Sequence, residues 1–296
     1  MIIDLHVHSS CSDGLFKVNQ IFKKASQTGI GLISITDHDS IDGQDEARIL
    51  SEKHGINYIC GLELSVSFSH PSYNNSKPIS LDFLGYNYNP ENIDLKNKLE
   101  DLKAYRKKRA DQILENINIE LIKEGKEKFT LKDLKEIENS VDGAFGRPHI
   151  ADYMVKIGLV KARQEAFDRY LVKCNVPKMP LSLEEAASLV KSAGGKLFMA
   201  HPNHPRGTSL IKFTQDLKLQ HDIITESILP FIDGIECWHS AHDKMTVDSY
   251  LKYSKEKQLL VSGGSDCHQQ PVIMGSVDVP EYVASQFDIQ PTNNHS

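Results

Sequence analysis

Two histidines stand two residues apart near the start of the chain, His6 and His8, directly after the apolar pair Ile2 and Ile3. Residues i and i+2 of a β-strand point to the same face, so a strand over 2–8 would place both imidazoles side by side. Paired imidazoles are common ligands of Zn and other transition metals. Taken alone, the pair is equally compatible with two ordinary histidines in an N-terminal segment.

The same residue types recur at the ends of four later apolar runs. These ends read Thr36-Asp37-His38-Asp39, Gly61-Leu62-Glu63, Ala200-His201-Pro202 and Ser265-Asp266-Cys267-His268. Five strand ends that carry His, Asp and Glu are hard to explain by core packing, so we expect them to meet in one cluster. With Asp13 and Asp82 added, the candidate metal ligands are His6, His8, Asp13, His38, Glu63, Asp82, His201, Asp266 and His268.

Two of these candidates have alternative interpretations. Asp13 lies in Ser12-Asp13-Gly14, which is good turn chemistry in its own right, and Asp82 is equally plausible as a capping or surface carboxylate. Nine ligands are too many for one ion and suit two or three, with a carboxylate as a bridge. Imidazoles mixed with carboxylates suit divalent Mn, Zn or Fe. Such a site indicates hydrolysis of a phosphate ester by a metal-activated hydroxide.

The bulk composition excludes several other classes of protein. The chain has 296 residues, 40% hydrophobic and 25% charged, with a formal net charge of −6. That balance argues against stable binding to duplex nucleic acid through a large basic face. No apolar run approaches the roughly 18–20 residues of a membrane span. Five scattered cysteines and no leader-like segment predict a cytoplasmic protein with reduced thiols, while the oligomeric state stays open.

The order of elements predicts an α/β protein with an all-helical insertion. Strand and helix patterns alternate over 1–88 and again over 181–284, which predicts seven parallel strands in a distorted (βα)7 TIM-like barrel. Strand signals disappear over 89–180, which we interpret as a helical lid over the rim that helps set substrate size. We expect the Lys107-Lys108-Arg109 run to lie on a solvated helix face and the polar tail, 285–296, to fray.

These motifs together resemble the polymerase and histidinol phosphatase (PHP) superfamily. The resemblance covers Met1 to about Gly275 and keeps the order and spacing of the motifs. It implies a distorted (βα)7 barrel with a trinuclear cluster of Mn, Zn or Fe. The helical insertion is similar to that of small phosphoesterases acting on AMP, on nucleoside 3′,5′-bisphosphates and on short oligoribonucleotides, so the expected partner is a small phosphorylated nucleotide. Asp82 stands where the family often has His.

Arg147 is the main candidate for contacting the substrate phosphate. It precedes Pro148, a good first residue of a helix, so its guanidinium fork would stand at a helix N-terminus that also favours anions. The segment Gly146–His149 resembles the family segment whose arginine reaches the phosphate. The alternative is a surface salt bridge with the acidic stretch around Glu136 and Glu138. The catalytic candidates are Arg147, His204 and Asp37, and the substrate-binding candidates are Arg147, His204, Arg206 and His242.

Three other functions compete with a nucleotide phosphoesterase. Histidinol-phosphate phosphatases share the metal motifs, and the insertion together with Arg147 favours nucleotides over that substrate. Amidohydrolase-type C–N hydrolases also open with His-x-His but commonly use a bridging Lys, for which no suitable residue follows a strand here. A non-enzymatic metal-binding module is disfavoured because the ligand set is nearly complete.

Overall fold

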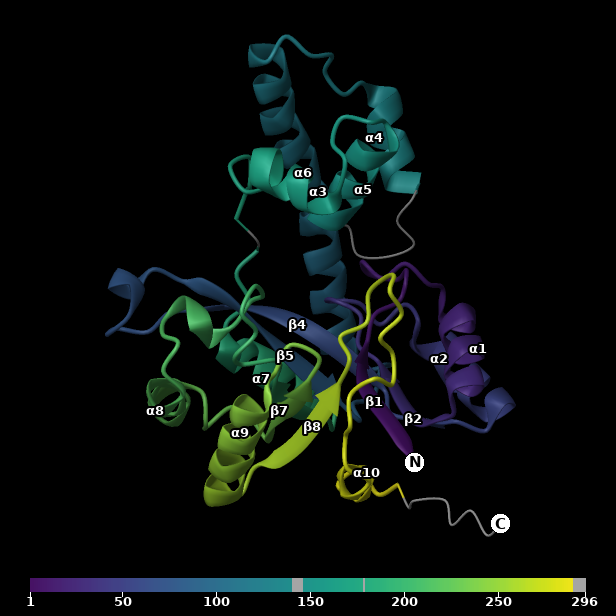
Figure 1. Ribbon diagram of the computed structural model, residues 1–296, viewed down its shortest axis with the longest axis vertical. Coiled ribbons are helices and arrows are strands. Elements are labelled where there is room, and N and C mark those ends of the chain that lie inside the picture. The colour runs from purple at the N-terminus through teal and green to yellow at the C-terminus, as the bar shows by residue number, and fades with distance from the viewer. Residues whose placement is uncertain (140–145, 178, 290–296) are drawn as a thin grey trace.

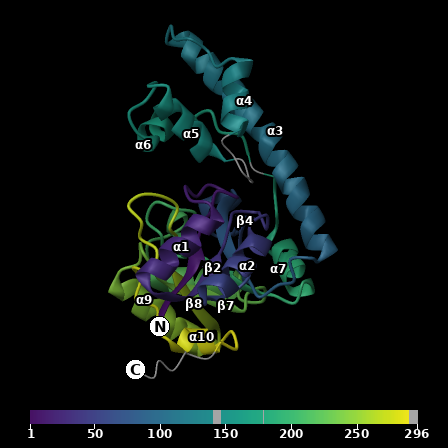
Figure 2. The same cartoon turned by 90° about the vertical axis from the view of Figure 1, so that its right-hand side faces the viewer.

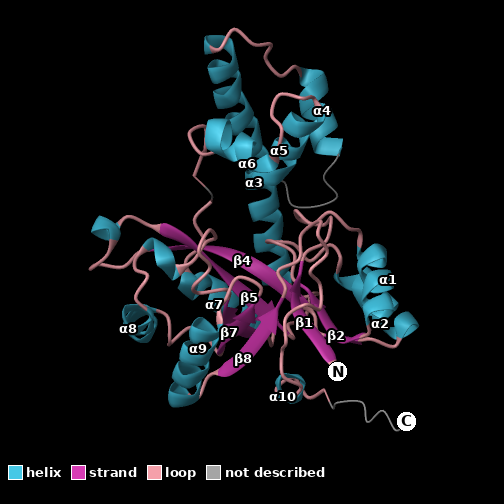
Figure 3. Cartoon of the chain, in the orientation of Figure 1, coloured by secondary structure: helices cyan, strands magenta, loops and turns pink. Residues whose placement is uncertain are grey.

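The strands form two sheets in the computed structural model (Figures 1 and 3), which describes residues 1–139, 146–177 and 179–289. The first sheet has the order β1 (Ile2–Val7), β2 (Ile30–Ile35) and β3 (Asn57–Tyr58). The second has the order β4 (Gly61–Phe68), β5 (Ile79–Tyr86), β6 (Lys196–Met199), β7 (Gly234–His239) and β8 (Leu260–Gly264). The α/β class is therefore confirmed.

The expectation of parallel strands throughout is wrong at β5. This strand runs antiparallel to both β4 and β6, whereas β1–β2–β3 and β6–β7–β8 are parallel. The reason is the connection: β4 and β5 are joined by the short segment 69–78, without the crossover helix that a parallel pair needs. The single strand expected over 56–66 is also divided into β3 and β4.

Two isolated parallel bridges join the sheets at the positions of predicted ligands. His38 pairs with Glu63, and Val7 pairs with Cys267. Next to the second bridge, the backbone N–H of Asp266 donates to the carbonyl of His6 over 2.8 Å. The end of β1 is thereby joined to the segment after β8, and the segment after β2 is joined to the start of β4. Closure into a seven-stranded barrel stays a prediction.

Helices pack around the strands through their apolar faces. In α1 (Val18–Thr28) the buried positions are Val18, Ile21, Phe22 and Ala25, the spacing of one helical face, and Gly29 ends the helix in a left-handed conformation. The remaining helices of this part are α2 (Gln44–His54), η1 (Asn74–Ser76), α7 (Leu183–Ser192), η3 (Leu210–Lys212), α8 (Leu217–Ser227), α9 (Lys244–Lys257) and α10 (Tyr282–Ser285).

The segment predicted to be a helical insertion has no strand among its described residues. Its elements are α3 (Ile93–Lys123), α4 (Leu131–Asn139), α5 (Arg147–Lys156), α6 (Arg163–Ala166) and the π-helical η2 (Phe167–Leu171). Figure 2 shows α3 running from the strands out to α4. Near its start Leu99 joins the core of the strands, and farther along Ile117 joins a separate core of the insertion. The domain boundaries at 89 and 180 stay a prediction.

Two surface expectations need correction. Arg109 is only 4% exposed, because α3 turns it toward the returning chain, where it donates to Val176 O and Asn175 Oδ1. In the expected tail, Phe287 is buried against Tyr86 and Phe198, because its ring fills the end of the core. Residues 290–296 lie outside the described part. No helix among the described residues is long and apolar enough to cross a membrane.

Candidate metal centre

Four predicted ligands form a group with the spacing of a tetrahedral metal site. His6 Nε2 lies 3.1 Å from His8 Nε2, and both lie 3.3 Å from Asp266 Oδ1. Glu63 Oε2 is 3.4 Å from the first nitrogen and 3.2 Å from the second. An ion about 2.0–2.1 Å from four tetrahedral ligands separates those ligands by about 3.3 Å, so this group fits a divalent transition metal.

A second group shares His8 with the first and adds three more predicted ligands. His8, Asp13, His38 and His268 can each offer one ligand atom within 4.8 Å of the others. His268 Nε2 lies 3.2 Å from Asp13 Oδ1, and its Nδ1 faces the carbonyl of Asp266 at 3.0 Å. That backbone contact leaves Nε2 free to serve as a ligand. The second group therefore fits another ion beside the first.

Glu63 lies between the groups and is placed to bridge them. Its Oε2 is 3.1 Å from His38 Nδ1, in addition to its contacts with His6 and His8, and its Oε1 is 3.0 Å from His201 Nε2. The side chain is 1% exposed. One carboxylate surrounded by four imidazoles suits a bridge between ions better than it suits a simple salt bridge.

The hydrogen-bond inventory supports the same conclusion. Buried polar atoms in proteins are almost always hydrogen-bonded, yet several buried atoms of this cluster have no hydrogen-bond partner. These atoms are Asp13 Oδ1, His38 Nδ1, His201 Nδ1, His239 Nε2 and Asp266 Oδ1. A divalent cation at each group would satisfy most of them, since each metal–ligand contact replaces a missing hydrogen bond.

Asp82 lies beside the cluster but is already engaged. It can approach His38 and Glu63 as part of a third candidate group. Its Oδ1 accepts a hydrogen bond from Ser65 Oγ at 2.8 Å, and its Oδ2 accepts one from Thr208 Oγ1. Asp82 therefore joins β4 to the loop after β6, and its role as a ligand stays a prediction.

Glu236 is the main residue that the sequence analysis missed. Its Oε1 accepts from His6 Nδ1 at 2.9 Å, and its Oε2 accepts from the backbone N–H of His201 at 2.8 Å. A carboxylate on Nδ1 fixes the tautomer and turns Nε2 toward a metal. The signal was present, because Gly234-Ile235-Glu236 repeats the glycine, apolar residue and glutamate of 61–63.

His239, the last residue of β7, also lies in the centre. Its Nε2 lies 3.4 Å from Asp266 Oδ2, while its Nδ1 accepts from the backbone N–H of Ala241 at 3.0 Å. Nε2 therefore faces Asp266 without a hydrogen bond. With His6 and Glu236, His239 forms a further group of possible metal ligands.

Asp37, a predicted catalytic residue, has a positioning role in this structure. Its Oδ1 accepts from the backbone N–H of Ser9 at 2.7 Å and from Ser12 Oγ at 2.6 Å, and its Oδ2 accepts from Ser9 Oγ at 2.6 Å. Both carboxylate oxygens are therefore used to hold the loop that carries Asp13. A direct catalytic role for Asp37 stays a prediction.

The predicted substrate-binding residues of the later loops surround the other side of the centre. The ring of His204 lies 5.8 Å from that of His201, and its Nδ1 accepts from the backbone N–H of Arg206. His242 Nδ1 donates to the carbonyl of Cys237 at 2.9 Å, which leaves its buried Nε2 without a hydrogen-bond partner. The side chain of Arg206 is exposed. Their contacts with substrate stay predictions.

Arg147 lies at the N-terminus of α5, as the sequence predicts, and the helix begins at Arg147 itself, one residue before Pro148. Its Nη1 donates to the carbonyl of Leu171 at 3.3 Å, and its guanidinium lies over the ring of Phe167. The alternative salt bridge is not formed with either expected partner, since Glu136 pairs with Lys156 and Glu138 with Lys107. Burial lowers the pKa of Arg147, so a charged partner such as phosphate would be favourable here.

The protonation of the centre follows from its dense packing of opposite charges. Burial alone would lower the pKa of His8, but Asp266 and Glu63 outweigh it and raise the pKa to about 10. Burial likewise opposes the charge on His201, yet Glu63 raises its pKa to about 9. Burial alone would raise the pKa of Asp266, but His6 and His268 hold it well below the ordinary range. Without an ion, protons on the imidazoles therefore balance the carboxylates.

Metal binding at neutral pH is expected to release protons, because ligand imidazoles must be neutral. In the metal-free protein His8 and His201 keep their protons up to about pH 10 and about pH 9. The apparent metal affinity should rise with pH until these values are passed. Calorimetric titration with Mn or Zn in buffers of different ionisation enthalpy measures the protons released. A pH-independent affinity without proton release would remove both histidines from the ligand set.

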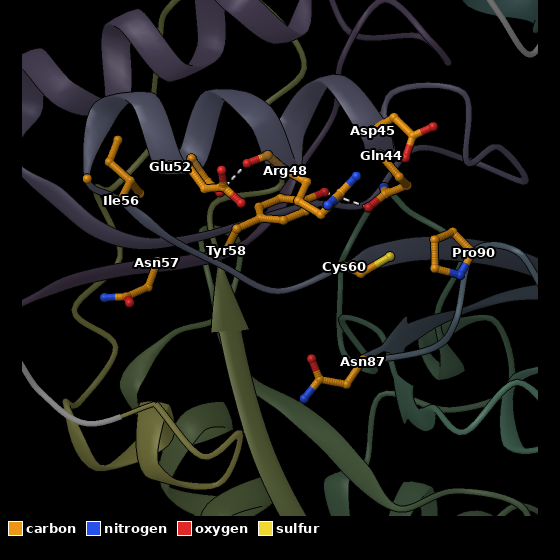
Figure 4. Close-up of a pocket in the computed structure, with 12 residues that line it drawn as sticks. Gln44, Asp45, Arg48, Glu52, Ile56, Asn57, Tyr58, Cys60, Asn87 and Pro90 are labelled. Carbon is orange, nitrogen blue, oxygen red and sulfur yellow. Dashed lines mark hydrogen bonds between the residues drawn. The ribbon is translucent and has the colours of Figure 1, made fainter.

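Two pockets differ in their relation to this centre. The larger, of about 570 Å³, lies between α2 and the segments at 57–60 and 87–90 (Figure 4), and its described lining contains no predicted ligand. The smaller, of about 400 Å³, is lined by Asp13 on one side and by His149, Tyr153 and Arg163 of the insertion on the other. The insertion therefore borders the metal centre, and the smaller pocket is the one relevant to chemistry.

Clustered imidazoles and carboxylates, buried or partly buried and spaced for divalent ions, define a metal-dependent hydrolase built on an α/β fold. A family model described as the PHP domain matches residues 4–172. The chain belongs to the PHP domain family, and it is a metal-dependent phosphoesterase.

Several known proteins are similar over nearly the full length. A 5′-3′ exoribonuclease of Haemophilus influenzae is 29% identical, with 90% of this chain and 89% of that protein covered. A 3′,5′-nucleoside bisphosphate phosphatase of Chromobacterium violaceum is 27% identical, with 90% and 87% covered. A solved structure from Bifidobacterium adolescentis, described as a metal-dependent phosphoesterase, aligns with a TM-score of 0.78 at 26% identity, covering 96% and 94%.

At least two transition-metal ions per chain are expected, because two candidate groups share His8 and Glu63 bridges between them. Elemental analysis of protein purified without chelator, or reconstituted with Mn or Zn, measures the ratio. A single ion after reconstitution would contradict a multinuclear centre.

Proposed function

We propose that the chain hydrolyses phosphate esters of nucleotides, with AMP, nucleoside 3′,5′-bisphosphates and short oligoribonucleotides as the candidate substrates. The observation that carries the proposal is the set of contacts that four imidazoles make with the buried Glu63 carboxylate, which fits two or more adjacent ions. Divalent ions bound there would supply activated water and hold the oxygens of an in-line displacement. The names of two relatives, a bisphosphate phosphatase and an exoribonuclease, support the nucleotide class.

The chain's own residues contribute orientation around that chemistry. Glu236 holds His6 and the backbone of His201, so that both point at Glu63. Arg147 stands at the N-terminus of α5, where its guanidinium fork and the positive end of the helix dipole favour a phosphate. The insertion narrows access beside Asp13, and we infer that it limits the size of the group attached to the phosphate.

The two alternative hydrolytic reactions are testable together with the main proposal. Phosphate release by the Mn-loaded protein should be measured across AMP, nucleoside bisphosphates, short oligoribonucleotides and histidinol phosphate, with amide hydrolysis assayed separately. We expect kcat/KM to be highest for a nucleotide. Preference for histidinol phosphate, or turnover of an amide without phosphate release, would overturn the proposal. The contacts of Glu63 with His38 and His201 support the choice of a phosphoesterase over a C–N hydrolase with a bridging Lys, because a glutamate would be available to bridge two ions there.

A further inference from the structure

A buried ion pair joins the helical insertion to the segment that carries His38. Arg106, in the middle of α3, donates from Nε to Asp39 Oδ2 at 3.0 Å and also from Nη2 to the same oxygen. The two side chains are 12% and 4% exposed. Burial opposes the charge of the guanidinium, but Asp39 outweighs burial and raises the pKa of Arg106. Two N–H groups of the guanidinium donate to the same carboxylate oxygen, and such charge-assisted hydrogen bonds restrict the relative positions of the two side chains.

Asp39 is connected to two predicted ligands through short backbone links. Its N–H donates to the carbonyl of Glu63 at 2.8 Å, and its Oδ1 accepts from the N–H of Ser65 at 3.1 Å. It follows His38 directly, which itself pairs with Glu63 in a parallel bridge. Asp39 also has a φ of 46°, a left-handed conformation that costs energy in a residue other than glycine. The contacts on both sides of Asp39 hold this backbone in place.

The helix that carries Arg106 is itself firmly anchored. Leu99 and Leu102, one to two turns before Arg106, are buried in the core of the strands. One turn after it, Arg109 donates hydrogen bonds to Val176 O and Asn175 Oδ1 on the chain returning from the insertion. Arg106 is therefore held between two fixed points, and its guanidinium has little freedom to follow a displaced Asp39.

A stabilising role explains this ion pair poorly. Replacing a buried ion pair with apolar residues is often neutral or favourable for stability, because both charges must be desolvated. Buried pairs are better suited to specifying one arrangement out of several. Here the specified arrangement is the position of the His38 segment against the strand of Glu63.

We propose that Arg106 is a positioning residue of the metal centre. Through its hydrogen bonds to Asp39, Arg106 keeps His38 and Glu63 in the positions that metal binding requires. The insertion is then part of the metal centre as well as a cover over it. The inference rests on the proposed metal-dependent function, and it concerns metal affinity, which can be measured without any substrate.

The test compares Arg106→Gln with a matched control on the same helix. Loss of a residue that orients ligands typically costs about 10–100-fold in metal affinity, and we expect this loss in calorimetric titrations with Mn. Arg106→Gln should also lower kcat when metal is limiting. Excess metal should restore kcat, and KM should stay unchanged. The control is Lys103→Gln, because Lys103 joins α3 to Asp42 at 2.8 Å but the pair is largely exposed. It should keep wild-type metal affinity.

Two further variants separate positioning from a simple folding defect. Arg106→Lys should recover part of the affinity, since an ammonium keeps the charge but lacks the fork. Arg106→Gln with Asp39→Asn removes both charges and the penalty of an unpaired carboxylate. Under the proposal, this double variant folds with near-normal circular dichroism and still binds metal at least about 10-fold more weakly.

Several results would overturn the inference. Wild-type metal affinity in Arg106→Gln, full recovery in the double variant, or an equal loss in Lys103→Gln would each do so. A pure KM effect with unchanged metal affinity would make Arg106 a substrate contact instead. If the wild type binds metal as expected but releases no phosphate from any ester, the proposed function fails while the positioning role stands.

Discussion

An Asp266→Asn variant is expected to lose at least about a thousandfold in kcat/KM for phosphate-ester hydrolysis. Metal ions contribute several kcal/mol of transition-state stabilisation, and each 1.4 kcal/mol is about tenfold in rate. Asp266 Oδ1 lies 3.3 Å from both His6 Nε2 and His8 Nε2, so losing its charge would disturb the tetrahedral group. Asn is the right replacement because Asp266 has a φ of 57°, which Asn tolerates better than Ala.

The loss at Asp266 should be accompanied by a loss of bound metal, measured by elemental analysis, while circular dichroism stays near that of the wild type. Asp288→Asn is the matched control, because Asp288 has a φ of 59° but is exposed and outside every candidate metal group. It should keep full activity. Near-normal turnover in Asp266→Asn would place the chemistry elsewhere.

Arg147→Ala is expected to weaken kcat/KM by about 2–4 kcal/mol, roughly 30- to 1,000-fold, the scale for losing a preorganised electrostatic contact in the transition state. Arg147 lies at the start of α5, and burial lowers its pKa. Its guanidinium donates to Leu171 O, and among the described contacts it has no carboxylate partner. Metal content should stay unchanged. Steady-state kinetics on the best nucleotide from the phosphate-release screen provide the measurement.

Arg147→Lys should recover only part of the loss, because an ammonium cannot present two parallel N–H groups to phosphate. Arg169→Ala serves as the control, since Arg169 belongs to the same insertion but pairs with Glu165 and Glu124 at the surface. It should leave kcat/KM within error of the wild type. Full activity in Arg147→Ala would mean that metals and other residues hold the phosphate, with Arg206 the next candidate.

The candidate ligands could be predicted because their signals are local. The two-residue period of a strand puts His6 and His8 on one face, and the structure confirms that their Nε2 atoms lie 3.1 Å apart. His38, His201 and Asp266 each follow an apolar run, so their places after β2, β6 and β8 are written in a few neighbouring residues. Glu63 and Asp82 instead lie inside β4 and β5. The helical character of the insertion was predictable for the same reason, from the helix-type pattern around Leu99 and Ile117.

Strand direction and partners across the fold were decided by tertiary structure. The apolar alternation of β5 is the same in either direction, so only pairing with β4 and β6 reveals that it is antiparallel. Glu236 contacts His6 from 230 residues away, and Arg106 reaches Asp39 across 67 residues. In the sequence, Arg106 resembles any charged residue of a long helix. Its contact with Asp39 depends on the path of α3 past that residue. No local pattern encodes this path, because α3 packs into two separate cores.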